Sequence, residues 1–309
     1  MSTPRLAVLG LLLNAVVWGL SWIGFQSLNA QGLHPLWMTA VISGFACLVF
    51  FAIKPAATLE VLQNPSLRLV FLAAGFTNVC FNTAITLGDV LRVTLLFYLM
   101  PVWAALLAHG LLGERINLVQ SARLGLGLLG AVLVLWQPKI GLPVPSSVAD
   151  WLGLAGGFFF ALNNVALRKA VAASDLGRAQ AMFMGGFLCS AALAWVLASN
   201  GRVPWPNAIA AAALPGAWAQ LAVWAALFLA ANYGVQYGAA RLTAHLTALV
   251  MLSEIFIAGV SSAVLGASEL RWQELLGGAL ILASPFLWHK PSAHSQEPAS
   301  PAPPAQKVQ

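Results

Sequence analysis

Long runs of apolar residues recur along the whole chain, separated by short segments rich in polar residues, Gly and Pro. A membrane-spanning helix needs about 20 mostly apolar residues, and ten runs come close to that length. They cover residues 6–27, 35–53, 68–88, 93–113, 119–136, 150–167, 179–198, 221–240, 245–266 and 273–288. Polar and apolar residues do not alternate within the runs, as they do in the strands of a membrane β-barrel. The pattern therefore predicts an all-α, polytopic membrane protein with ten transmembrane helices.

The composition agrees with lipid as the solvent. Hydrophobic residues make up 60% of the chain and charged residues only 8%, whereas a soluble domain carries about 25% charged residues. The net charge is +6, but the Lys and Arg residues are scattered among the short loops and form no basic stripe. Binding to nucleic acid is therefore not expected.

The Lys and Arg residues fall mainly on one side of the predicted bundle. With ten spans, both termini and alternate loops share a side, and that side holds eleven of the 15 basic residues. The other side holds only Arg92, Lys139, Arg202 and Arg271. Because positive residues stay in the cytoplasm, we predict a bacterial inner (plasma) membrane protein with both termini cytoplasmic.

The chain divides into two halves that resemble each other, residues 6–136 and 150–288. A tail follows over 289–309, and its Pro, Ala and Ser content predicts a disordered cytosolic extension. At one common offset, residues 99–103 align with 253–257, and the amides of Asn78 and Asn82 align with those of Asn232 and Gln236. Each half holds five spans, an odd number, so the second copy must be inverted relative to the first. Inverted repeats are common in secondary transporters.

Several short motifs, in their order and spacing, resemble those of the EamA family of the drug/metabolite transporter superfamily. They are Trp18-Gly19-Leu20-Ser21-Trp22, Pro101-Val102-Trp103-Ala104-Ala105-Leu106-Leu107, Leu112-Gly113-Glu114-Arg115, residues 161–169, and Leu276-Gly277-Gly278-Ala279-Leu280-Ile281. The resemblance covers nearly all of residues 6–288. It implies ten helices in two inverted five-helix repeats around a central cavity, and export of amino acids or related metabolites by alternating access. In one departure, Ile255 stands where the family's second repeat usually has Pro after its Glu.

Polar residues inside the apolar runs are the candidates for a substrate cavity, because such groups need partners in hydrocarbon. Glu254 lies near the middle of its span, where an ionised, unpaired carboxylate costs roughly 2.5 kcal/mol or more. It is also the candidate residue for coupling transport to protons. The other cavity candidates are Trp18, Asn78, Asn82, Tyr98, Asn163, Asn232 and Gln236. Hydrogen bonds that only hold the helices together remain the alternative role for the amides and for Glu254.

Pro101 is the candidate hinge of the fourth span, because proline interrupts the hydrogen bonding of a helix. Sequence motifs of other chemistries are missing: there is no P-loop, HExxH or GxSxG motif. Cys47, Cys80 and Cys189 lie far apart in separate runs, which favours neither a disulfide nor a zinc site. We therefore predict no catalytic residue, no cofactor and no metal, and a protein that is not an enzyme.

The leading hypothesis is a secondary transporter that exports amino acids or similar small neutral or zwitterionic metabolites. The alternative is a lipid-linked sugar flippase or a nucleotide-sugar carrier. Anionic substrates would favour Lys or Arg inside the spans, and the one candidate, Arg123, lies near the cytosolic edge of its span. The expected partners are a small-molecule substrate and the lipid bilayer, and a homodimer stays open.

Overall fold

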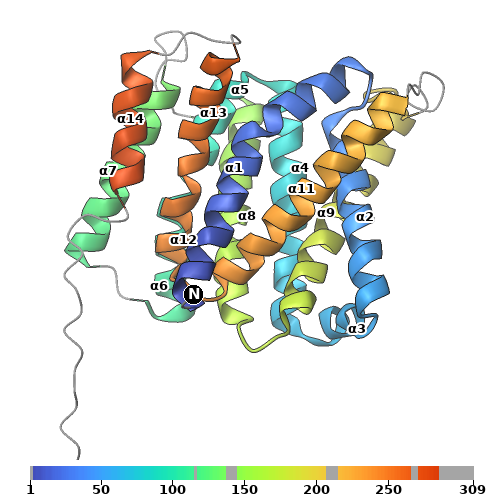
Figure 1. The fold of residues 1–309 in the computed structure, drawn as a ribbon, viewed down its shortest axis with the longest axis horizontal. Helices are drawn as coiled ribbons and strands as arrows, with labels where there is room; N and C mark the ends of the chain where they lie inside the picture. The colour runs from blue at the N-terminus through green and yellow to red at the C-terminus, as the bar shows by residue number, and fades with distance from the viewer. Residues whose placement is uncertain (1–2, 115–116, 137–144, 207–214, 266–270, 285–309) are drawn as a thin grey trace, which may run out of the picture.

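The computed structural model describes residues 3–114, 117–136, 145–206, 215–265 and 271–284, and all regular structure within these ranges is helical (Figure 1). The helices are α1 (Thr3–Ala30), α2 (Pro35–Ile53), α3 (Ala56–Gln63), α4 (Pro65–Leu87), α5 (Val90–Phe97), α6 (Met100–Leu112), α7 (Leu118–Leu135), α8 (Val148–Lys169), α9 (Asp175–Ser199), α11 (Pro215–Ala239), α12 (Ala244–Met251), α13 (Ser253–Val264) and α14 (Trp272–Ala283). The prediction of an all-α protein is confirmed over these ranges. The predicted tail, 289–309, lies outside them.

Seven stretches of the described chain are long and apolar enough to cross a membrane. Five are the single helices α1, α2, α4, α7 and α9, and two combine a pair of helices, α5 with α6 and α12 with α13. Helices α8, α11 and α14 correspond to the other three predicted runs. Helix α8 carries two Asn and three charged residues, and α14 is described over only 12 residues. The protein is therefore a multi-pass membrane protein, with seven such stretches among the described residues where ten spans were predicted.

Two of the predicted spans are not continuous helices. The run 93–113 is divided between α5 and α6 at Tyr98, and Pro101, which has no N–H to donate, lies in the first turn of α6. The run 245–266 is divided between α12 and α13 at Leu252, without a proline. Tyr98 and Leu252 are equivalent residues under the offset that relates the two halves. The break at Leu252 leaves no mark on the apolar pattern, so the sequence predicted one helix there.

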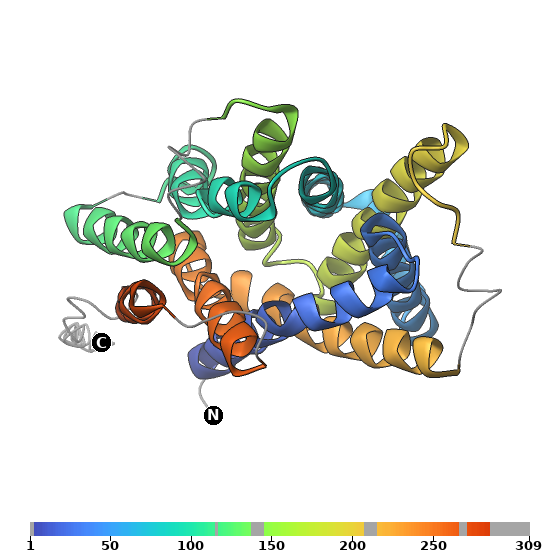
Figure 2. The ribbon, with the colours of Figure 1, turned by 90° about the horizontal axis from the view of Figure 1, so that it is seen from above.

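The helices form a bundle in which neighbours in space are often distant in sequence (Figures 1 and 2). Helix α1 packs along α11 and α13, α8 packs along α4 and α6, α2 crosses α9, and α7 pairs with α14. The backbones approach closely where Gly10 faces Gly234 and where Gly130 faces Gly277, as is common between helices in membranes. Large apolar side chains such as Leu48 and Trp195 are exposed on the outside, which suits a surface in contact with lipid.

The end of α8 and the start of α9 lie at the end of the bundle at which α1 begins (Figure 1), and charged residues there form a network. Asp175, at the start of α9, pairs with Arg178 and, at 3.0 Å, with Arg241 at the end of α11. Arg178 is only 1% exposed and donates to the carbonyl oxygens of Ala170 and Ala173, where α8 ends. The network therefore ties the ends of α8, α9 and α11 together.

Candidate functional site: a central cavity

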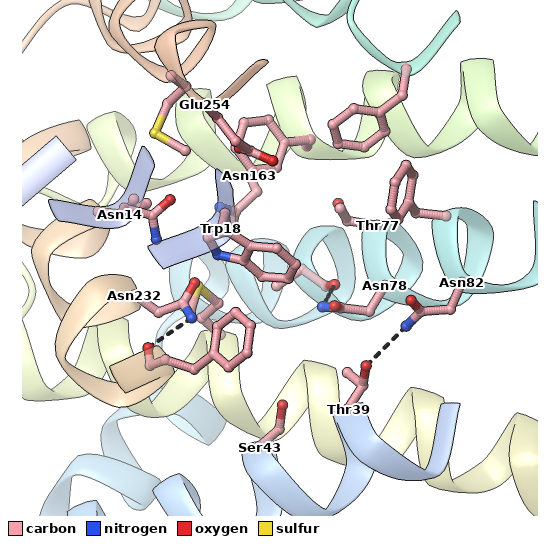
Figure 3. Close-up of a pocket in the computed structure, with 18 of the residues that line it drawn as sticks. Asn14, Trp18, Thr39, Ser43, Thr77, Asn78, Asn82, Asn163, Asn232 and Glu254 are labelled. Carbon is pink, nitrogen blue, oxygen red and sulfur yellow. Dashed lines mark hydrogen bonds between the residues drawn. The ribbon is translucent and has the colours of Figure 1, made fainter. Parts of the chain in front are cut away.

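A cavity lies inside the bundle between the two halves of the chain (Figure 3). Residues from every described helix except α3, α7 and α14, together with Tyr98 at the break between α5 and α6, line it. The centres of water molecules can occupy about 120 Å³ of it, and a single water needs about 10–15 Å³ on that measure. The cavity can therefore hold several waters or a small solute.

Seven of the eight predicted cavity residues line this space. They are Trp18, Asn78, Asn82, Tyr98, Asn163, Asn232 and Glu254. The eighth, Gln236, is fully buried outside the cavity, and its amide nitrogen contacts the sulfur of Met182 in α9. It lies one helical turn beyond Asn232, so its side chain is displaced by about 6 Å along α11 and rotated by about 40°. Gln236 therefore lies outside the cavity, and the prediction that it lines the same cavity as Asn232 is wrong. Whether the seven residues bind substrate stays a prediction.

Glu254 and Tyr98 are brought together by the two helix breaks. Tyr98 lies where α5 ends, and Glu254 lies in the first turn of α13, directly after the second break. Both residues line the cavity there, with the hydroxyl of Tyr98 close to the carboxyl group of Glu254. The breaks thus place an acidic group and a hydroxyl donor close together at the wall of the cavity.

The amides on the other side of the cavity are held by hydrogen bonds through their nitrogen atoms. Asn78 donates to the carbonyl oxygen of Ala74 at 2.9 Å, and Asn232 donates to that of Phe228 at 2.8 Å. Asn82 donates to the hydroxyl of Thr39 at 2.9 Å (Figure 3). Asn78 and Asn232, which align at the offset found in the sequence, thus make the same bond, four residues back along their helices. Their carbonyl oxygens are left as acceptors.

The remaining wall is largely aromatic. Trp18 packs edge-on against Phe228, with 4.7 Å between the ring centroids, and Phe25 lies beside both rings. Across the cavity, Phe97 packs against Phe160 at 5.7 Å. Among the described residues that line the cavity, Glu254 is the one carboxylic acid, and none is Lys or Arg.

Sequence reasoning missed Asn14, which lines the cavity from α1 and is only 1% exposed. Its signal was present, because a lone amide inside the run 6–27 is the same feature that pointed to Asn78. The hydroxyl residues Thr39, Ser43 and Thr77 also line the cavity. Hydroxyls are common in membrane helices, where they often bond to their own backbone, so their sequence signal is weak. Pro101, the predicted hinge, is buried next to the cavity-lining Met100.

Comparisons with known proteins agree with the resemblance found in the sequence. Residues 5–136 match the model of the EamA-like transporter family. Among solved structures 29 chains match, and one of them, a crystal structure of a protein, shares the fold with a TM-score of 0.69. That protein is 19% identical in sequence, and the match covers 90% of this chain and 94% of the other. No curated protein matches the chain.

Proposed function

We propose that this chain, whose residues 5–136 match the EamA-like transporter family, belongs to that family of the drug/metabolite transporter superfamily and is a secondary transporter of the bacterial inner membrane. It exports amino acids or similar small neutral or zwitterionic metabolites by alternating access. The observation that carries the proposal is the central cavity, which both halves of a multi-pass chain line and which contains a single acidic group, Glu254.

The proposal includes ten spans in two inverted repeats, and the helix packing supports it. The contacts of α1 with α11 and α13 have counterparts in the contacts of α8 with α4 and α6. Where α2 and α9 cross, each helix presents a glycine to a side chain of the other: Gly44 faces Phe187, and Gly186 faces Ser43. Reciprocal contacts of this kind are what an axis between two related halves would produce.

The proposed orientation places both termini in the cytoplasm. The end of the bundle at which α1 begins also holds the end of α2, the start of α4, the end of α8 and the start of α9 (Figure 1). Basic residues are frequent there, and they include Lys54, Arg68, Arg168 and Arg178. Arg92 and Arg271 begin helices at the opposite end. This asymmetry supports a cytoplasmic position for the first end.

The charges of the cavity favour a neutral or zwitterionic solute over the alternative substrates. A nucleotide-sugar or a lipid-linked sugar brings phosphate groups, which proteins usually bind with Arg, Lys or helix N-termini. None of the described residues that line the cavity is Lys or Arg, and of the two helix starts at its wall, those of α6 and α13, the second carries Glu254. An anionic substrate would therefore face a carboxyl group of like charge.

Glu254 is proposed to couple transport to protons. A carboxyl group inside the membrane is costly when ionised and unpaired, so it can take up a proton from one side and release it to the other as access alternates. Alternatively, the ammonium group of a substrate can pair with the ionised form. In either case, the side to which the cavity opens determines whether Glu254 holds its partner, the proton or the substrate ammonium group.

The test is transport by the full chain in liposomes, with a panel of amino acids and related solutes, with and without a pH gradient. At least one solute should move faster than in protein-free liposomes. Glu254→Gln should fold normally but lose gradient-driven transport or its pH dependence. Glu114→Gln is the matched control, because Glu114 lies outside the cavity. Its carboxylate pairs there with Arg168, with 3.6 Å between the nitrogen and the oxygen. If no solute moves at any pH, the protein is not such a transporter.

A further inference from the structure

Two buried amides of the cavity have hydrogen-bonding atoms without a partner. Neither the nitrogen nor the oxygen of the Asn14 side chain has a hydrogen-bond partner, although this residue is only 1% exposed. The side-chain oxygen of Asn163, which is 3% exposed, also has none. Both residues line the cavity. Because burying an unpaired polar group costs free energy, a molecule inside the cavity is expected to satisfy them.

Asn14 and Asn163 lie at the same end of the cavity as Glu254. Asn14 is one helical turn from Leu11, which packs in one cluster with Tyr98 and Ile255. Asn163 is one turn from Phe160, which packs against the same cluster. Figure 3 shows Asn14, Asn163 and Glu254 on one side of the Trp18 ring, with Asn78, Asn82, Thr39 and Ser43 on the other.

The chemistry of this end suits an ammonium group. A primary ammonium has three N–H donors and no acceptor. The carbonyl oxygens of Asn14 and Asn163 and the carboxylate of Glu254 can supply three acceptors, and the carboxylate can add charge, which strengthens its hydrogen bond. The hydroxyl of Tyr98 lies close to the carboxyl group of Glu254, and a hydrogen bond from it would hold that group in place.

Resting on the proposed transport function, we propose that Asn14, Asn163 and Glu254 form a binding site for a primary ammonium group, and that the substrates, zwitterionic amino acids among them, carry this group on an apolar or aromatic body. The aromatic side chains of Trp18 and Phe228 receive that body. Since none of the described residues that line the cavity is Lys or Arg, a carboxylate on the substrate gains no ionic partner from them. An amine without a carboxylate should therefore bind at least as well as the corresponding amino acid.

Three probes of one shape test the proposal: phenethylamine, phenylalanine and hydrocinnamate, which carry the amine alone, both groups and the carboxylate alone. Equilibrium binding to the purified full chain and uptake into liposomes are measured for each. Phenethylamine should bind at least as tightly as phenylalanine, and hydrocinnamate at least tenfold more weakly than either. Hydrocinnamate binding as tightly as phenethylamine would overturn the site. So would the absence of phenethylamine binding from a folded protein.

Substitutions assign the effect to the amides. Asn14→Leu and Asn163→Leu should each weaken phenethylamine binding about tenfold, whereas Asn14→Asp, which adds a carboxylate at the same place, should strengthen it. Asn200→Ala, at the exposed end of α9, is the control and should change nothing. Equal binding of phenethylamine by the wild type, Asn14→Leu and Asn14→Asp would refute the assignment. Binding of phenethylamine without transport of any solute would uphold the ammonium site and overturn the transporter.

Discussion

The contact between α1 and α11 depends on two glycines, and Gly234→Ala should destabilise the protein by separating these helices. A Cβ atom on Gly234 would lie 2.6 Å from the carbonyl oxygen of Gly10, and a Cβ on Gly10 would lie 2.6 Å from that of Gly234. The atoms that would be met belong to the backbone, so no side-chain rotation can make room.

The size of the effect follows from the distance. An ordinary contact of a Cβ atom begins at 3.4 Å, so the two backbones must move apart by about 0.8 Å. Overpacking of this kind costs about 1–3 kcal/mol. Alanine is favoured over glycine inside a helix by about 0.5–1 kcal/mol, which offsets part of that cost. We expect a net destabilisation of about 1 kcal/mol.

Thermal unfolding of the purified protein in detergent, followed by intrinsic fluorescence, measures the change. Gly125→Ala in α7 is the matched control, because Gly125 is exposed and a Cβ there meets nothing within 4 Å. The two substitutions should therefore move the melting midpoint in opposite directions, Gly234→Ala downward and Gly125→Ala upward. The double variant Gly10→Ala/Gly234→Ala should lose less than the sum of its parts, since one separation of the helices relieves both clashes. A rise in the midpoint for Gly234→Ala as large as that for Gly125→Ala would show that α1 and α11 do not touch at this point.

Three further predictions concern orientation, stability and pH. Alkaline phosphatase fused after Gln309 should be inactive in cells, because the terminus is predicted to be cytoplasmic; an active fusion would reverse the orientation. Arg178→Met should lower the unfolding free energy by about 3 kcal/mol, since it leaves the carbonyl oxygens at the end of α8 without their buried donor. Arg168→Met should change the unfolding free energy little, because the ion pair of Arg168 with Glu114 is partly exposed. The neutral ring of His34 caps α2 by accepting a hydrogen bond from the backbone N–H of Leu36 at 3.2 Å. Burial lowers the pKa of His34 below its ordinary 6.5. The stabilisation by this cap is therefore complete above about pH 6.5 and declines as the pH falls below that value. His34→Asn, which keeps an acceptor but does not titrate, should flatten that decline in melting midpoint; an unchanged pH profile would exclude His34 as its source.

Much of the candidate site could be predicted because its signal is local. A polar residue inside an apolar run stands out wherever the run folds, and this feature pointed to Asn78, Asn82, Asn232 and Glu254, all of which line the cavity. The failure at Gln236 has a geometric cause. Two residues four positions apart lie on nearly the same face of a helix, but their side chains are one turn apart along its axis. Spacing alone therefore cannot predict that both line a cavity that is short in this direction.

The sequence by itself determined that this chain is a helical membrane protein and where most of its helices lie, because hydropathy and helix length are properties of consecutive residues. The structure alone revealed the break between α12 and α13, which no proline marks, and the close approach of Tyr98 to Glu254 that the two breaks allow. It also showed that the side-chain amide of Asn14 and the side-chain oxygen of Asn163 are left without hydrogen-bond partners. These features arise from contacts between helices far apart in the chain. Whether a buried group has a partner depends on what packs against it, and no pattern along a single helix records that.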